Sequence, residues 1–307
     1  MTADWLHPAL RFAQYVVLLG LFGIVAFRVV RLRRVVPDTS MTSFRAIAVA
    51  AMMAPILSLA VMLASVAAMM GQPIQDLELA TVQAMVLMTD TGTAFLARMV
   101  LLALGLAAVL FIRPITPQHI LAAWCYGLAL VTFAWSGHAA ATGGTFGLVH
   151  RLNDGLHLLA AGLWIGAIGW FTILVLAAHK NPDRVKPEDL RDAMESFAPL
   201  GITLVVVVAV TGVLNSHLVF GLENSMDVLG TTYGWLLAAK VLAVALMVMC
   251  AARNARLVRR SFIVQSGRQA ATDVTLVAVR SSLAVELLLA IFVVMLVAFT
   301  GLASPMG

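Results

Sequence analysis

Seven histidines lie along this 307-residue chain. Its apolar segments place five of them, His7 included, at one end of a helical bundle, and four of these five lie at the ends of the fourth, fifth and sixth segments. The four are His138, His150, His157 and His217. Neutral imidazole binds copper, zinc, iron and nickel, and affinity alone favours copper among the divalent ions. The four histidines therefore predict a transition-metal site where the ends of three consecutive apolar segments meet.

Helical spacing places an aspartate beside two of these histidines. His150, Asp154 and His157 stand four and three residues apart, which puts their side chains on one face of an α-helix. The two imidazoles are still about 10 Å apart along the axis, too far to hold one ion by themselves. We expect His138 or another helix to complete the site. Asp154 is then a ligand, or the carboxylate that orients an imidazole.

Thioether sulfurs are predicted near the same end. Met70 closes the second apolar segment, and Met85 and Met88 lie in the polar and apolar mixture of residues 71–91, which predicts a short interfacial helix. Sulfur beside imidazole is typical of sites for Cu(I), or for both copper states.

The composition predicts that these residues are carried by membrane-spanning helices. The chain is 62% hydrophobic and 11% charged, with a mean hydropathy of +0.98. Its apolar stretches run for about 20 residues, the length that crosses a bilayer as a helix. We expect an all-α, polytopic helical bundle with eight transmembrane helices, and exclude a soluble domain, a β-barrel and a disordered chain. The expected spans are 9–29, 45–70, 92–112, 118–136, 152–178, 197–218, 232–252 and 279–301.

The basic residues predict how this bundle is oriented. The chain has 20 Lys and Arg and a pI of about 9.8, and most of these residues follow the first, third, fifth and seventh spans. The positive-inside rule places those loops in the cytoplasm and both termini in the periplasm. The basic pI therefore indicates topology and contact with membrane lipid, not binding to nucleic acid.

Several polar residues fall inside the expected spans, where an ionised side chain needs a partner or a polar cavity. Arg98, Lys240, Glu286 and Asn215 are therefore candidates for a permeation path, together with the three methionines above. Gly162, Gly166 and Gly169 predict a face for close helix packing.

The sequence around the histidines resembles a known family. The segments SGHAAATGG (136–144) and HRLNDGLHLLAAGLWIGAI (150–168) look like the signature of the bacterial copper resistance protein D (CopD) family. The likeness continues through 196–215, 233–240 and 252–256 to the last span, and it divides the single membrane domain 1–307 into a four-helix part, 1–130, and a CopD-like part, 131–307.

The resemblance implies a multi-pass protein of the bacterial inner membrane that handles copper. It implies movement of copper from the periplasm toward the cytoplasm, beside a separate periplasmic copper-binding partner of the CopC type. The copper residues proposed for the family correspond to His138, His150, Asp154 and His157 here. No nucleotide-hydrolysis motif is visible in the sequence, so we expect a protein that is not an enzyme, with passage that is passive or driven by the membrane potential.

Two other interpretations stay open. Two histidines on different helices also suffice to ligate haem b, so the chain can be an electron carrier that reduces copper or a partner at the periplasmic face. A copper sensor or scaffold that does not transport would differ only in the absence of flux.

Overall fold

The computed structural model describes residues 5–30, 41–112, 115–137, 143–180, 187–264 and 269–302, and helices are the regular structure in these ranges. The long helices are α1 (Leu6–Val30), α2 (Met41–Met70), α4 (Asp90–Phe111), α5 (Ile115–Val131), α6 (Gly144–Lys180), α7 (Pro187–Phe220), α9 (Thr232–Val264) and α10 (Gln269–Thr300). The short ones are η1 (Ile74–Asp76), α3 (Leu79–Met88), η2 (Thr132–Trp135), η4 (Leu222–Asn224) and α8 (Ser225–Leu229).

Eight helices in the described ranges are long and apolar enough to cross a membrane, which confirms the expected number of spans. The fifth differs from its expected bounds, because α6 begins at Gly144 and not near residue 152. Residues 144–151 are rich in glycine and polar groups, so they lack the apolar signal of a span although they are helical. His150 therefore lies well inside α6.

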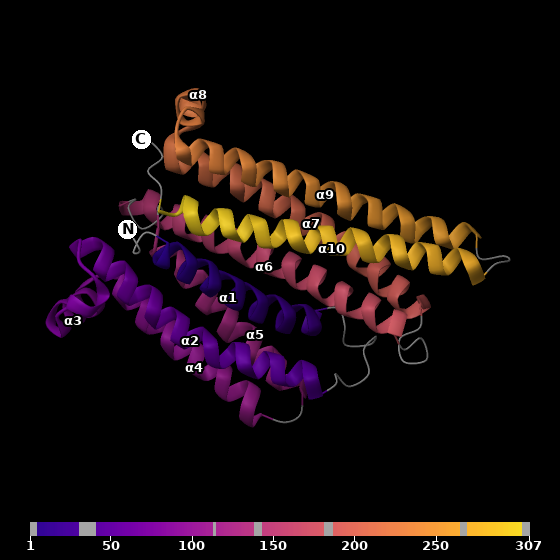
Figure 1. Cartoon of the computed structure of the whole chain (residues 1–307), viewed down its shortest axis with the longest axis horizontal. Helices are drawn as coiled ribbons and strands as arrows, with labels where there is room; N and C mark the ends of the chain where they lie inside the picture. The colour runs from indigo at the N-terminus through magenta and orange to yellow at the C-terminus, as the bar shows by residue number, and fades with distance from the viewer. Residues whose placement is uncertain are drawn as a thin grey trace.

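The long helices form two neighbouring groups (Figure 1). The first group is α1, α2, α4 and α5, and the second is α6, α7, α9 and α10. Helices α1 and α6 join the groups, since α1 packs on α2, α5, α6 and α10 while α6 packs on α1, α5, α7 and α10. Helices α3 and α8 lie at the same end of the bundle as both marked chain ends (Figure 1), and we call this the α3–α8 end.

Helices α1 and α6 approach each other backbone to backbone. A Cβ atom built on Gly23 of α1 would lie 2.2 Å from the carbonyl oxygen of Gly162, and one built on Gly166 would lie 2.2 Å from the Gly23 backbone. A Cβ on Gly169 would meet open space. The close-packing face therefore consists of Gly162 and Gly166, and Gly169 is not part of it.

The segment after α2 folds back onto the α3–α8 end. Val82, Met85 and Val86 of α3 pack against a small core made by α2 and α4. The Thr89 side chain accepts a hydrogen bond from the Gly92 amide at 3.0 Å and so caps α4. This packing leaves Met88 84% exposed beside the ends of the long helices.

Candidate metal-binding site

The first turns of α6 carry the polar side chains of the candidate site. His150 is buried, with 2% of its surface exposed, and Asn153 is buried as well. Asp154 and His157 are partly buried. Helix α6 packs on α7 of its own group and on α1 and α5 of the other group.

Helix α7 supplies a row of hydrogen-bond partners to this turn of α6. The Asn153 amide donates to the Thr211 carbonyl oxygen at 2.9 Å and to Oδ1 of Asn215 at 2.7 Å. The Asn215 amide in turn donates to Oδ1 of Asp154 at 3.1 Å. These bonds lock the register of the two helices and fix the direction of the Asp154 carboxylate.

The His157 ring is held by Thr211, with Nδ1 lying 2.8 Å from Oγ1. The Thr211 hydroxyl donates its one hydrogen to the Val207 carbonyl oxygen, so Oγ1 accepts from the imidazole. This hydrogen-bond network assigns the hydrogen to Nδ1 and leaves the lone pair of Nε2 for a metal ion. A histidine ligand oriented through its other ring nitrogen is the usual arrangement at metal sites.

A lysine lies within electrostatic range of this carboxylate and imidazole. Lys240 of α9 interacts electrostatically with both Asp154 and His157. Tyr15 of α1 also interacts with Asp154. The partly buried Asp154 is therefore the centre of charge of the site, placed between a lysine, a histidine and a tyrosine from three different helices.

His217 and the methionines lie around this centre and not within it. Nδ1 of the exposed His217 accepts a long hydrogen bond, 3.5 Å, from the Leu222 amide in the turn that follows α7. Met70 ends α2 with its side chain exposed, Met88 projects from α3, and Met85 packs into the core under α3. The α3–α8 end thus carries thioethers and an imidazole at its rim.

Arg98 and Glu286 occupy two other places in the bundle. Arg98 of α4 bonds Thr132 in the first helix group. Glu286 of α10 is buried and accepts a hydrogen bond from the Asn254 amide of α9. Glu286 and Asn254 line a cavity of about 830 Å³ with apolar walls from α6 and α7, including Trp164, toward the end opposite α3 and α8.

The predicted ligand set is only partly contained in the ranges that the structure describes. His138 lies outside the described residues. Within those ranges, no three His, Cys, Asp or Glu side chains come together as a group that could hold a metal ion. The candidate donors whose side chains are held by α7 are Asp154, bonded by Asn215, and His157, bonded by Thr211.

Asn153 and Thr211 were not among the site residues predicted from the sequence. Thr211 stands in a run of valines, and Asn153 is a lone amide beside the more conspicuous Asp154. One signal was present in the sequence. Thr211 and Asn215 are separated by four residues in an apolar span, so they share a face, and a polar face in such a span needs a polar partner.

Comparison with known proteins places these residues in a family. Residues 1–148 match the family model "Copper resistance protein D-like, N-terminal domain", and residues 191–300 match "Copper resistance protein D". The chain is 31% identical over 307 residues to copper resistance protein D of Pseudomonas syringae pv. tomato, covering 98% of this chain and 97% of that protein. The chain belongs to the copper resistance protein D family.

Two further relatives share part of the chain. The copper transport protein CutJ of Bacillus subtilis (strain 168) is 34% identical over 117 residues, which are 38% of this chain and 20% of that protein. The inner membrane protein YebZ of Escherichia coli (strain K12) is 27% identical over 205 residues, 65% of this chain and 66% of that protein. No solved structure matches the chain.

Proposed function

We propose that this protein binds copper ions at the α3–α8 end of its bundle and passes them through the bacterial inner membrane toward the cytoplasm. Membership of the copper resistance protein D family gives the chain a copper-related function, and its eight apolar helices make it a multi-pass membrane protein. The proposal adds where copper is captured, which path it follows through the bundle and in which direction it moves.

The orientation of His157 is the observation that carries the proposal. Thr211 takes the Nδ1 hydrogen, so Nε2 offers a lone pair, and the Asp154 carboxylate stands one helical turn away in a direction fixed by Asn215. An imidazole and a carboxylate can together bind a copper ion. Because the ion would have few ligands here, it could also dissociate and move on. His150 and His138 are the proposed further ligands from the same mouth.

The methionines at the rim are proposed to meet the ion first. Met88 of α3 and Met226 of α8 are 84% and 83% exposed, and Met70 is exposed at the end of α2. Thioether sulfur prefers Cu(I). A periplasmic copper-binding protein of the CopC type is the proposed donor of this copper, with His217 as a further ligand at the rim.

Beyond His157, the proposed path follows α6 into the large cavity. Trp164, which lines that cavity, comes seven residues after His157 and therefore about 10 Å farther along the helix. Lys240 stands beside the entrance to this path, and Glu286 provides a buried carboxyl group within the cavity. The copper ion would thus move from an imidazole and carboxylate pair to a second oxygen donor.

The membrane potential supplies the proposed driving force. A monovalent cation gains about 2.3 kcal/mol per 100 mV when it moves to the negative side. Arg191 of α7 and the exposed Arg253 and Arg256 of α9 lie at the end opposite α3 and α8. Such arginines favour a cytoplasmic position for that end, so copper bound at the α3–α8 end would move inward.

Copper binding and copper flux are the measurements that test this function. The purified protein is analysed for bound copper and for visible absorption, and is then reconstituted into vesicles that report copper uptake. The variants are Asp154→Asn and His157→Ala. The control is His179→Ala, which changes an exposed histidine at the other end of the same helix.

We expect both site variants to lose at least tenfold in copper affinity and in uptake, and the control to match the wild type. If the protein binds copper but no copper crosses the vesicle membrane, the protein would be a sensor or scaffold and not a transporter. A Soret absorption band that disappears in His157→Ala would overturn copper transport in favour of the haem b electron carrier.

A further inference from the structure

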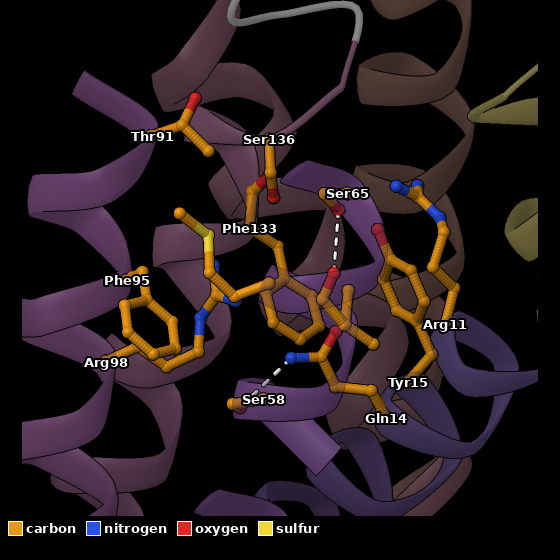
Figure 2. A pocket seen from close by; sticks show the side chains of 12 residues that line it. Arg11, Gln14, Tyr15, Ser58, Ser65, Thr91, Phe95, Arg98, Phe133 and Ser136 are labelled. Carbon is orange, nitrogen blue, oxygen red and sulfur yellow. Dashed lines mark hydrogen bonds between the residues drawn. The ribbon is translucent and has the colours of Figure 1, made fainter. Parts of the chain in front are cut away.

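A small polar cavity lies in the first helix group, apart from the His157 site. It has a volume of about 30 Å³ and lies between α1, α2, α4 and the residues around η2. Figure 2 shows Arg11, Gln14 and Tyr15 entering it from α1, Ser58 and Ser65 from α2, and Arg98 from α4. A space of this size holds about one water molecule or one ion of similar size.

Two buried arginines line this cavity. Arg11 is 9% exposed and Arg98 is 5% exposed, and the two guanidinium groups interact electrostatically with each other. In the described ranges an ion pair with a carboxylate forms between Arg191 and Asp192, and neither Arg11 nor Arg98 makes one. Two like charges at one membrane-embedded cavity repel each other and are costly without a counter-charge.

Uncharged groups accept hydrogen bonds from some of the N–H groups of Arg98. Its Nε donates to Thr132 Oγ1 at 2.7 Å, one Nη donates to the Thr132 carbonyl oxygen at 3.2 Å, and the guanidinium carbon lies 4.3 Å from the centre of the Phe133 ring. These contacts orient the Arg98 side chain but do not neutralise its positive charge. Nε of Arg11 is buried and has no hydrogen-bond partner among the described residues.

Several hydrogen-bond donors of the cavity are unused, beside the amide oxygen of Gln14, which can accept. Ser65, Thr91 and Ser136 donate their hydroxyl hydrogens to backbone carbonyl oxygens, so they are already satisfied. Ser58 accepts from the Gln14 amide at 3.0 Å, which leaves its own hydrogen and the second amide hydrogen of Gln14 to donate. The Tyr15 hydroxyl adds a further donor at the cavity. Unused donors beside two positive charges match a negatively charged ligand.

We infer that this cavity binds one small monovalent anion of the size of chloride. The volume of about 30 Å³ excludes phosphate, carboxylic acids and lipid headgroups, so the aqueous phase at the α3–α8 end is the source. The positive charges of Arg11 and Arg98 would attract the ion, and Ser58 and Gln14 would donate hydrogen bonds to it. This inference uses residues outside the copper site and does not depend on the proposed transport.

Binding of radioactive chloride to the detergent-purified full chain tests the inference directly. We expect saturable binding near one chloride per chain, competition by bromide and none by phosphate. Arg11→Gln and Arg98→Gln are each expected to weaken binding at least tenfold. Arg45→Gln, which changes an exposed arginine on α2, is the matched control and should bind like the wild type.

A second measurement separates binding from simple misfolding of a variant. The thermal unfolding midpoint of the wild type is compared in chloride and in gluconate at equal ionic strength. We expect a higher midpoint in chloride for the wild type and Arg45→Gln, and a smaller difference for Arg11→Gln. Equal midpoints in both salts together with no saturable chloride binding by the wild type would overturn the inference, and so would competition by phosphate equal to that by bromide.

Discussion

The hydroxyl of Thr211 contacts Nδ1 of His157 and so leaves Nε2 for the proposed copper ion. It accepts the Nδ1 hydrogen because its own hydrogen is committed to the Val207 carbonyl oxygen. A partner that fixes both the tautomer and the direction of a histidine typically contributes 10–100-fold to metal affinity. At the proposed copper site, Thr211 would therefore be a positioning residue that acts through His157.

Thr211→Val removes this acceptor while keeping the size and branching of the side chain. We expect copper affinity to fall about 10-fold or more, with a small change in the thermal unfolding midpoint. Thr203→Val is the matched control, because Thr203 makes the same type of bond to a backbone carbonyl on α7 but is exposed and remote from His157. Isothermal titration with Cu(I) under a reducing atmosphere measures both variants. Equal affinities for the two would show that Thr211 does not position the ligand.

Lys240 lies within electrostatic range of the carboxylate that would receive copper. It interacts electrostatically with Asp154 and His157, so a bound copper ion and the ammonium group repel each other. We predict that Lys240→Met raises copper affinity roughly tenfold, the size of one screened interaction between neighbouring charges. The same variant should slow release, so uptake into vesicles should fall while binding tightens. If copper binding by Lys240→Met weakens instead, Lys240 stabilises the structure of the site and does not repel the copper ion.

At the level of helices, the contact between α1 and α6 holds the two groups together. Gly23, Gly162 and Gly166 let the backbones touch, and this contact also brings Tyr15 within electrostatic range of Asp154. Because the atoms that a side chain added at Gly23 or Gly166 would meet belong to the backbone, the helices cannot yield there by a rotamer change. The glycine contact would therefore affect the proposed metal site as well as the fold.

Substitution in this contact should separate the helices. We predict that Gly166→Leu destabilises the protein by at least about 1–3 kcal/mol, the usual cost of overpacking, and lowers copper affinity as well. Gly169→Leu, one helical turn away, introduces the same side chain where a Cβ meets open space. Thermal unfolding in detergent compares the two variants. If Gly169→Leu lost as much stability, the destabilisation of Gly166→Leu would come from a change in helix propensity and not from the α1–α6 contact.

The sequence predicted individual helices better than the relations between them. Apolar runs of about 20 residues specified the eight spans, and the helical period placed His150, Asp154 and His157 on one face. The register between α6 and α7 was not predictable, because it depends on Asn153 meeting Thr211 and Asn215 across a helix pair. The start of α6 was also missed, since its first two turns lack the apolar residues of a span.

Charge is distributed unevenly over the whole molecule, with separate centres in its two helix groups. Arg11 and Arg98 make the first group positive near the α3–α8 end, whereas Asp154 lies between α6, α7 and α1 in the second. A copper ion captured at this end, as proposed, would be attracted by Asp154, and Arg11 and Arg98 would repel it only while no anion neutralises them. These charges would favour entry beside α6 over entry beside α4.

The direction of transport depends on which end of the bundle faces the periplasm. The basic loops predict that the α3–α8 end does, and single cysteines test this in cells after Cys125 and Cys250 have been replaced by alanine. We predict that a membrane-impermeant maleimide labels Met88→Cys and Met226→Cys, both on strongly exposed positions, but not Asp192→Cys at the opposite end. Permeabilised cells should label all three positions, which controls for reactivity. The reverse pattern in intact cells would place the copper site in the cytoplasm, and the membrane potential would then oppose outward movement of the ion by about 2.3 kcal/mol per charge at 100 mV.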